Sequence, residues 1–106
     1  MTATPLLPPR DCRDLNDIRI AIDRIDQDII EALGLRMRYV EAASAFKPDE
    51  ASIPAPERVA AMLPQRREWA ESANLDSQFV HELYHHIIHW YIQQQVIYWR
   101  SQRGLT

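Results

Sequence analysis

The chain has 106 residues, a formal net charge of −3 and a pI near 5.7, which together predict one small domain. Its 46% hydrophobic and 25% charged residues are typical of a globular protein, and the acidic balance argues against nucleic acid or anionic membranes as partners. No apolar run has the length of a membrane span or the pattern of a signal peptide, and the single Cys12 fits a reducing cytoplasm.

The first part of the chain predicts a leader followed by a long helix. Residues 1–13 hold three prolines and no periodicity, which predicts a flexible leader before one helical domain over 14–106. Asp14 is a plausible N-cap, and the helix should end at Lys47, because a residue that precedes proline is disfavoured in the α region. Apolar residues recur along it at the spacing of a packed stripe: Leu15, Ile18, Ile22, Ile25, Ile29 and Ala32.

Two further helices follow a loop from Pro48 to Pro56. Pro56 suits the first turn of a short second helix, which Pro64 should kink or break. The inner face of this helix is predicted to comprise Val59, Met62, Leu63, Trp69 and Ala73. A third helix should run from about Asp76 to Arg103, before Gly104, with a stripe of Phe79, Leu83, Ile87, Tyr91 and Tyr98. Since no segment alternates at period two, the predicted fold class is all-α.

The length of the first helix predicts an oligomer. A helix of about 32 residues spans roughly 48 Å, whereas a compact domain of this size has a radius of gyration of about 13 Å. Two partner helices from the same chain cannot cover an apolar stripe of that length. We therefore expect an intertwined homodimer, in which a second copy of the chain covers the rest.

Cations along the first helix predict a site for a small anion. Arg36 falls within the apolar stripe, and Arg19 and Lys47 border it, whereas Arg38 points elsewhere. A cation in an apolar seam is costly unless an anion meets it. Arg36 and Lys47 share a face about 16 Å apart, so both can reach one ligand. Arg19 is about 25 Å from Arg36 and turned away from it, so we expect it to complete the site of a second, antiparallel chain.

Gln95 is the predicted polar partner on the third helix. It lies beside the apolar stripe, and a buried amide requires hydrogen-bond partners, which an oxygen of a bound ligand would provide. Simpler interpretations stay open for each residue alone. Arg19 has an i+4 partner in Asp23, Lys47 can be an ordinary helix-terminal lysine, and Gln95 can be a solvated member of a glutamine run.

Histidines offer a competing site. His81, His85 and His89 recur every four residues, a spacing at which two imidazoles on one face can bind zinc. No cysteine or HExxH pattern completes such a site, so a solvated or intersubunit histidine face is favoured and no metal is expected. The chain also has no catalytic-triad pattern and only two glycines, which disfavours a nucleotide-binding loop.

A family resemblance is carried by the segments LNDIRIAIDRIDQDIIEALGLRMRYVEAASAFK, PERV and LDSQFVHELYHHIIHWYIQQQ. They resemble the all-helical chorismate mutase family over nearly the whole chain beyond the leader. Two segments, IPAPERVAAMLPQRREWAE and IIHWYIQQQVIYWR, are most similar to the branch of that family that cleaves isochorismate into salicylate and pyruvate for siderophore synthesis.

The resemblance implies an intertwined homodimer with two sites for a cyclohexadiene dicarboxylate and no cofactor. By matching position, Arg36 would hold one carboxylate and Arg19 from the second chain the other. Lys47 and Gln95 would face the ether oxygen, where negative charge builds as the C–O bond breaks. The reaction implied is a pericyclic elimination, and the loop from Pro48 to Pro56 would be a lid.

One departure from the family pattern distinguishes two reactions. Mutases of the family carry an arginine immediately before the glutamate that matches Glu57, and here that position is Pro56. An acidic lid residue three positions before that arginine corresponds to Ile53. These losses favour elimination of pyruvate, with chorismate rearrangement as a weak side reaction. A monofunctional chorismate mutase and a non-catalytic helical dimerisation module stay open as alternatives.

Overall fold

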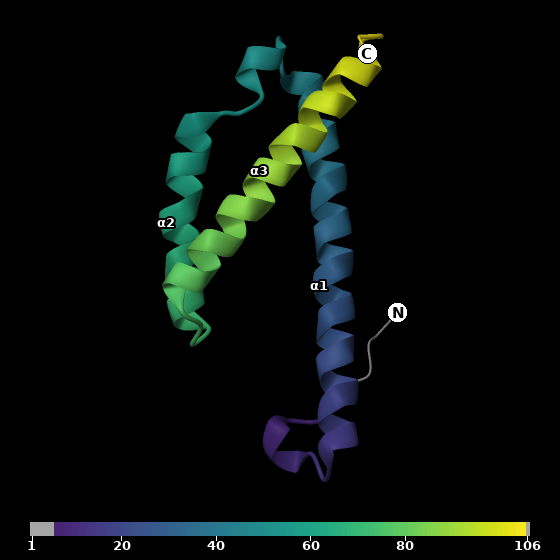
Figure 1. Cartoon of the computed structure of the whole chain (residues 1–106), viewed down its shortest axis with the longest axis vertical. Coiled ribbons are helices and arrows are strands. Elements are labelled where there is room, and N and C mark those ends of the chain that lie inside the picture. Colours follow the sequence, from purple (N-terminus) through teal and green to yellow (C-terminus); the bar gives the residue numbers. More distant parts are fainter. Residues whose placement is uncertain (1–5, 106) are drawn as a thin grey trace. The chain divides into compact units, whose positions relative to one another are not determined.

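Residues 6–105 are described by a computed structural model, and within that range all regular structure is helical (Figure 1). The long helices are α1 (Leu15–Ala43), α2 (Pro56–Ser72) and α3 (Ser77–Gln102). The 3₁₀ helices are η1 (Pro9–Asp11), η2 (Ser44–Phe46) and η3 (Glu50–Ser52). The predicted all-α fold with three helices is therefore confirmed. The first five residues of the predicted leader lie outside the described range.

The predicted cap of α1 is confirmed. The Asp14 carboxylate accepts a hydrogen bond from the main-chain N–H of Asp17 at 2.9 Å, which satisfies a donor that the helix itself leaves unpaired. Asp17 in turn accepts from the main-chain N–H of Arg13 at 3.0 Å and from its Nε at 3.2 Å. These two hydrogen bonds lower the pKa of the Asp17 carboxyl below its ordinary value.

The predicted end of the first helix at Lys47 is wrong by one turn. The α-helix ends at Ala43, and the chain then tightens into the 3₁₀ helix η2. Lys47 itself has φ −93° and ψ 115°, the extended backbone that the following proline favours. The proline therefore acts on Lys47 as expected, but the preceding residues leave the α geometry earlier, as helix ends often do through a 3₁₀ turn.

The boundaries of α2 and α3 match their local signals. Pro56 is the first residue of α2, and Ala55 before it has a left-handed φ of 43°. The helix continues through Pro64, so the predicted break does not occur, and the alternative of a kink stays a prediction. At the start of α3 the Asp76 carboxylate accepts from the N–H of Phe79 at 2.8 Å. After its end, Gly104 adopts φ 69°, which a glycine tolerates without strain.

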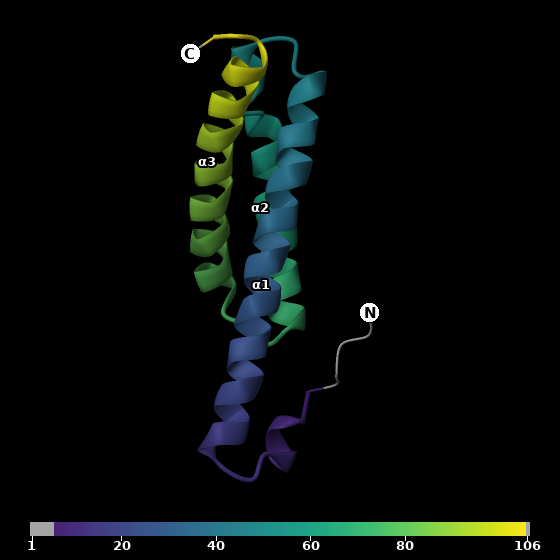
Figure 2. The ribbon, with the colours of Figure 1, turned by 90° about the vertical axis from the view of Figure 1, so that its right-hand side faces the viewer.

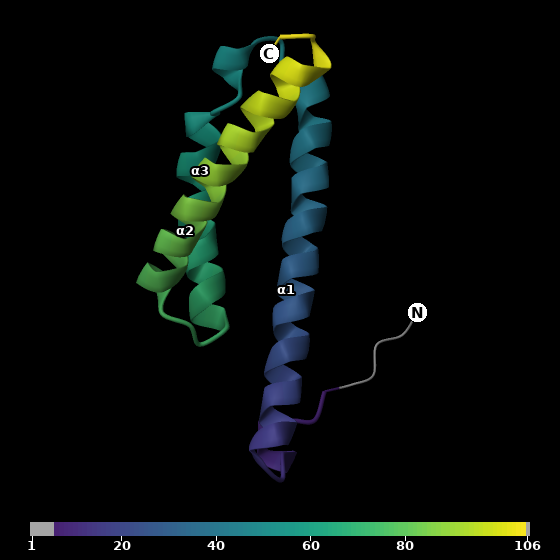
Figure 3. The same cartoon turned by 45° about the vertical axis from the view of Figure 1, so that its right-hand side comes forward.

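The chain divides into two compact units, residues 1–36 and 37–106, and the predicted single domain over 14–106 stays a prediction. In the second unit, α2 and α3 lie side by side as an antiparallel pair (Figures 1 and 2). The segment between α1 and α2 lies at the same end of this unit as the last turns of α3 (Figure 3), and α3 contacts both η2 and η3. The core of this unit comprises Ile53, Met62, Ala70, Val80, Ile88, Tyr91 and Trp99.

Part of the predicted inner faces is exposed in the single chain. Trp69 and Phe79 are each 54% exposed, Leu83 is 41% exposed, and Ala73 is also exposed. In their place, α3 buries Val80, Ile88 and Trp99, which occupy a neighbouring face of the same helix. The predicted stripes therefore identify apolar surface, part of which is exposed in the single chain.

The first unit carries an apolar surface without a cover in the single chain. Its stripe along α1 is between 41% and 57% exposed at Leu15, Ile18, Ile22, Ile25 and Ile29. Isolated exposed leucines or isoleucines are ordinary on a protein surface, whereas this row is continuous along the helix; its burial by a second copy of the chain stays a prediction. Among the described residues, no helix combines the length and apolar character that crossing a membrane requires.

Candidate active site

Lys47 is a half-buried cation whose ammonium is not neutralised within the described part of the chain. It is the only lysine in the sequence. Its Nζ donates to the main-chain carbonyl of Ser52 at 3.2 Å, and among residues 6–105 it forms no ion pair with a carboxylate. An ammonium that is partly removed from water and bound only to a neutral carbonyl retains its attraction for an anion.

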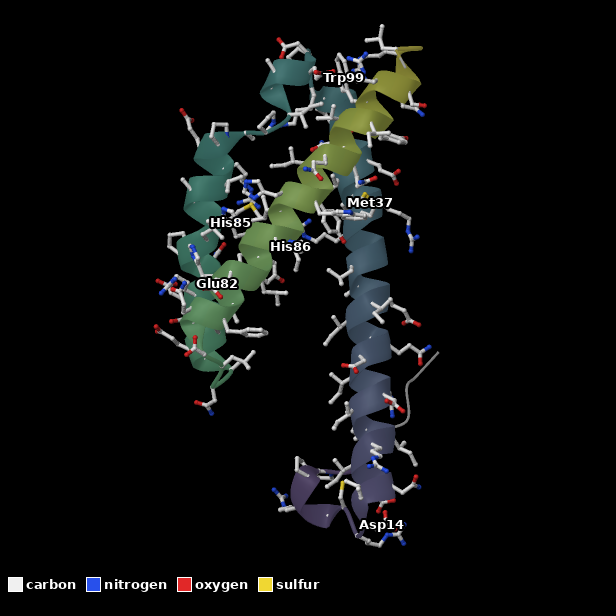
Figure 4. The ribbon with its side chains drawn as sticks, in the orientation of Figure 1. Asp14, Met37, Glu82, His85, His86 and Trp99 are labelled. Atoms are coloured by element: carbon white, nitrogen blue, oxygen red, sulfur yellow. The ribbon has the colours of Figure 1, made fainter. Side chains whose placement is uncertain are left out.

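The main chain of Lys47 is held on both sides of its Cα. Its N–H donates to Ser44 O at 3.2 Å within η2. Its carbonyl accepts two hydrogen bonds. One comes from Trp99 Nε1 of α3 at 3.0 Å, and the other from Nη2 of Arg103, the residue that follows α3, at 3.2 Å. Figure 4 shows Trp99 near the end of α3, where the helix meets this segment.

Gln95 is buried, as the sequence predicted. The residue is 6% exposed, and its Nε2 donates to the main-chain carbonyl of Val40 at 3.1 Å. Trp99 follows one helical turn later on the same face of α3. Gln95 and Trp99 thus donate from α3 to two carbonyls of the segment 40–47, those of Val40 and Lys47. The predicted residues Lys47 and Gln95 therefore both lie where α3 meets this segment.

The two predicted arginines belong to the first unit. Arg36 is half-buried, and Arg19 is exposed. Arg19 forms no ion pair with Asp23 in the described part of the chain, so that simpler interpretation of its position is not realised. The meeting of Arg19 and Arg36 with Lys47 and Gln95 at one ligand stays a prediction.

The segment after Lys47 is a folded loop. The Asp49 carboxylate accepts from the N–H of Ser52 at 2.9 Å, and Ser52 Oγ donates to Asp49 O at 2.8 Å. Glu50 pairs with Arg100 of α3 at 2.7 Å, and Ile53 is only 2% exposed. The loop thereby holds the Ser52 carbonyl opposite the Lys47 ammonium.

Sequence reasoning missed Trp99 and Arg103. No site role was predicted for Trp99, although it lies four residues after Gln95 and carries an indole N–H that needs an acceptor when buried. Arg103 stood at the expected end of the last helix and gave no pattern of its own. Only the contacts to a segment more than fifty residues away reveal their connection with Lys47.

The histidines of α3 contact one another and the main chain. The rings of His85 and His89 lie 4.2 Å apart between centroids, and His89 Nδ1 is 2.7 Å from the His85 carbonyl. His85 and His86 are labelled on α3 in Figure 4. Within residues 6–105, no three side chains of histidine, cysteine, aspartate or glutamate are grouped so as to hold a metal ion.

Comparison with known proteins identifies the family. The chain is 65% identical over 96 residues to the isochorismate pyruvate lyase of Pseudomonas aeruginosa, which covers 91% of this chain and 95% of that protein. Residues 18–96, more than half of the chain, match the family described as chorismate mutase type II, which confirms the resemblance predicted from the sequence. On these two matches and its three-helix fold, the chain belongs to the chorismate mutase type II family.

Proposed function

We propose that the protein is an isochorismate pyruvate lyase that forms salicylate and pyruvate for siderophore synthesis, with a weak chorismate mutase side activity. The identity of 65% to a lyase along nearly its whole length carries this proposal. The half-buried ammonium of Lys47, which has no carboxylate partner in residues 6–105, supports it. Pro56 supports the lyase over a mutase, because a neutral proline stands immediately before Glu57, where mutases of the family carry an arginine.

The proposed reaction is a rearrangement of bonds within the substrate. The ring C2 hydrogen of isochorismate passes to the methylene carbon of the enolpyruvyl group while the ether C–O bond breaks. Pyruvate leaves, and the ring becomes aromatic, so atoms and electrons balance without a further reactant. The protein contributes the folded conformation of the substrate and fixed positive charge at the oxygen that becomes negative.

Each site residue has a proposed role in that task. Lys47 and Gln95 face the ether oxygen, where the ammonium and the amide N–H groups stabilise the developing charge. Arg36 binds one substrate carboxylate, and Arg19 from the second protomer binds the other, since a guanidinium matches the two oxygens of a carboxylate. These roles need the substrate to displace or share the present contacts of Lys47 with Ser52 O and of Gln95 with Val40 O.

A homodimer is part of the same proposal. The exposed stripe of α1, together with the exposed Trp69, Phe79 and Leu83 of α2 and α3, gives each chain more apolar surface than a stable monomer presents. A second copy carries the same surfaces, so a two-fold assembly can cover both sets at once. That assembly also supplies Arg19 to the site of the other protomer.

A charge in the stripe tests the dimer. Ile25→Glu puts a carboxylate into the proposed interface, and we expect a monomer in analytical ultracentrifugation and loss of salicylate formation, because an unpaired buried carboxylate is costly. Ile20→Glu is the matched control, since Ile20 is 59% exposed, Ile25 is 44% exposed, and the two lie about 140° apart around the helix. The control should remain dimeric and active. A fully active, dimeric Ile25→Glu protein would contradict the interface.

The substrate itself tests the function. Incubation with isochorismate should produce salicylate, detected by its fluorescence, and incubation with chorismate should produce prephenate much more slowly. Fast prephenate formation without salicylate would identify a monofunctional mutase, for which the family match is the supporting observation. Turnover of neither compound would favour the dimerisation module.

A further inference from the structure

We propose that Trp99 and Arg103 are positioning residues that aim the Lys47 ammonium by holding the main-chain carbonyl of Lys47. The inference rests on the proposed function, in which that ammonium meets the ether oxygen. Neither residue is proposed to touch the substrate. Both act through the backbone of Lys47, to which they are hydrogen-bonded at 3.0 and 3.2 Å.

The backbone at Lys47 needs such a support. Lys47 follows η2 and precedes Pro48, so the helix no longer fixes its carbonyl and the next residue has no N–H to donate. Its only local main-chain hydrogen bond runs from its own N–H to Ser44 O at 3.2 Å. Rotation about the Cα–C bond of Lys47 turns its side chain relative to the following peptide, so a fixed carbonyl restrains the side-chain direction. A displacement of about 1 Å is enough to impair a catalytic group.

Trp99 provides a fixed donor. The residue is 7% exposed, so its Nε1–H has little access to water and depends on the Lys47 carbonyl as its acceptor. A buried donor that loses its acceptor is costly, which confines the carbonyl to one place relative to the indole ring. The indole is rigid and is packed in the core of the second unit. The Lys47 carbonyl is therefore held at a fixed position relative to α3.

Arg103 is fixed by the same tryptophan. Its guanidinium carbon lies 4.1 Å from the centre of the Trp99 ring, and its Nη1 donates to Trp99 O at 3.4 Å. This stacking restrains an otherwise flexible side chain. Its Nη2 can then donate to Lys47 O, at 3.2 Å, and reaches Ser44 O at 3.5 Å. Trp99 and Arg103 together hold the Lys47 carbonyl, and Arg103 also reaches the Ser44 carbonyl at the start of η2. We refer to these two residues as the clamp.

A neighbouring contact provides a control. Arg100 lies on the last turn of α3 and pairs with Glu50 of the loop at 2.7 Å. Both side chains are more than 40% exposed, and within residues 6–105 neither is hydrogen-bonded to Lys47. An exposed ion pair of this kind stabilises a protein little. Removing the Arg100–Glu50 pair therefore removes a contact between α3 and the loop but leaves both hydrogen bonds to the Lys47 carbonyl in place.

The first measurement is steady-state kinetics of salicylate formation. Trp99→Phe keeps a buried aromatic ring without the donor, and Arg103→Leu removes the second donor at an exposed residue. We expect each to lower kcat about tenfold, with KM changed less than about threefold, because binding by the arginines is retained. Arg100→Gln should stay within about twofold of the unchanged protein. An unchanged kcat in both Trp99→Phe and Arg103→Leu would overturn the inference.

A double-mutant cycle separates positioning from a general loss of structure. In a Lys47→Ala background, Trp99→Phe and Arg103→Leu should lower the residual kcat no further, since no ammonium remains to be aimed. An equal loss in both backgrounds would show that the residues serve stability alone and would overturn the inference. Arg103→Leu carries the test if Trp99→Phe unfolds, because Arg103 is exposed and contributes little to the core.

The outcomes also separate this inference from the proposed function. If the protein forms salicylate and Lys47→Ala loses turnover, but both clamp variants keep full kcat, the clamp is wrong and the function stands. If the unchanged protein forms no salicylate from isochorismate, the proposed function fails and the inference fails with it.

Discussion

Lys47→Ala is expected to lower kcat for isochorismate cleavage about a hundred- to a thousandfold while the dimer still folds. The substitution removes the cation proposed to stabilise the ether oxygen, and that charge develops only as the C–O bond breaks. Ground-state binding by Arg36 and Arg19 is retained, so the loss should appear in kcat and much less in KM. Salicylate fluorescence at saturating substrate gives kcat directly, and circular dichroism confirms the helical fold.

Two further variants make this result specific. Lys47→Met keeps most of the length of the side chain without its charge. If the charge is what matters, its kcat should be as low as that of Lys47→Ala. Arg38→Ala removes an exposed cation of α1 that lies outside the proposed site, and it should retain full activity. Near-normal turnover in Lys47→Met would contradict an electrostatic role, and unfolding of both Lys47 variants would assign Lys47 to structure.

Mixing two inactive variants is expected to restore activity. Arg19→Ala and Lys47→Ala each damage both sites of a homodimer. In a mixed dimer, one site receives both alanines, and the other receives an intact Arg19 from one protomer and an intact Lys47 from its partner. Random exchange of subunits should therefore give about a quarter of the full activity, because half of the dimers are mixed and half of their sites are intact.

The same mixture distinguishes trans from cis assembly. If Arg19 served the site of its own chain, every site in the mixed dimer would carry one alanine, and mixing would restore nothing. The exchange is followed by mass spectrometry of the intact dimers, so that a failure to recover activity can be compared with the measured fraction of mixed species. Arg36→Ala mixed with Lys47→Ala should stay inactive, because both residues are proposed to serve one site from one chain.

Local signals predicted the helix boundaries better than the packing. Pro56, Asp76 and Gly104 each act within one turn of the backbone, and each marks the expected boundary in the structure. The end of α1 differs from the prediction, and the turn that precedes Lys47 also accepts hydrogen bonds from Arg103, which follows α3, at the carbonyls of Ser44 and Lys47. A contact to a distant segment is not encoded in the residues around the turn.

Helical periodicity located Gln95 but not its surroundings. The spacing placed this amide beside an apolar stripe, and it is indeed buried. The same reasoning placed Trp69 on an inner face and Phe79 in the main stripe, and both are exposed in the single chain. A sequence shows that a residue is apolar and on which face of a helix it lies, but a helix with two apolar faces does not show which of them meets its own chain. Trp99 and Arg103 were missed for a related reason, since their acceptor is a main-chain atom that any residue could provide.

The isolation of Lys47 among arginines has a practical consequence for covalent chemistry. Because Lys47 is the only lysine, an amine-directed reagent such as pyridoxal phosphate with borohydride has one side-chain target in the whole chain. Arginines do not form the imine that borohydride reduces, so apart from the α-amino group the label reports on the ammonium beside Ser52. Coupling this protein to a surface or a dye through lysine would therefore attach it by the residue proposed to do its chemistry.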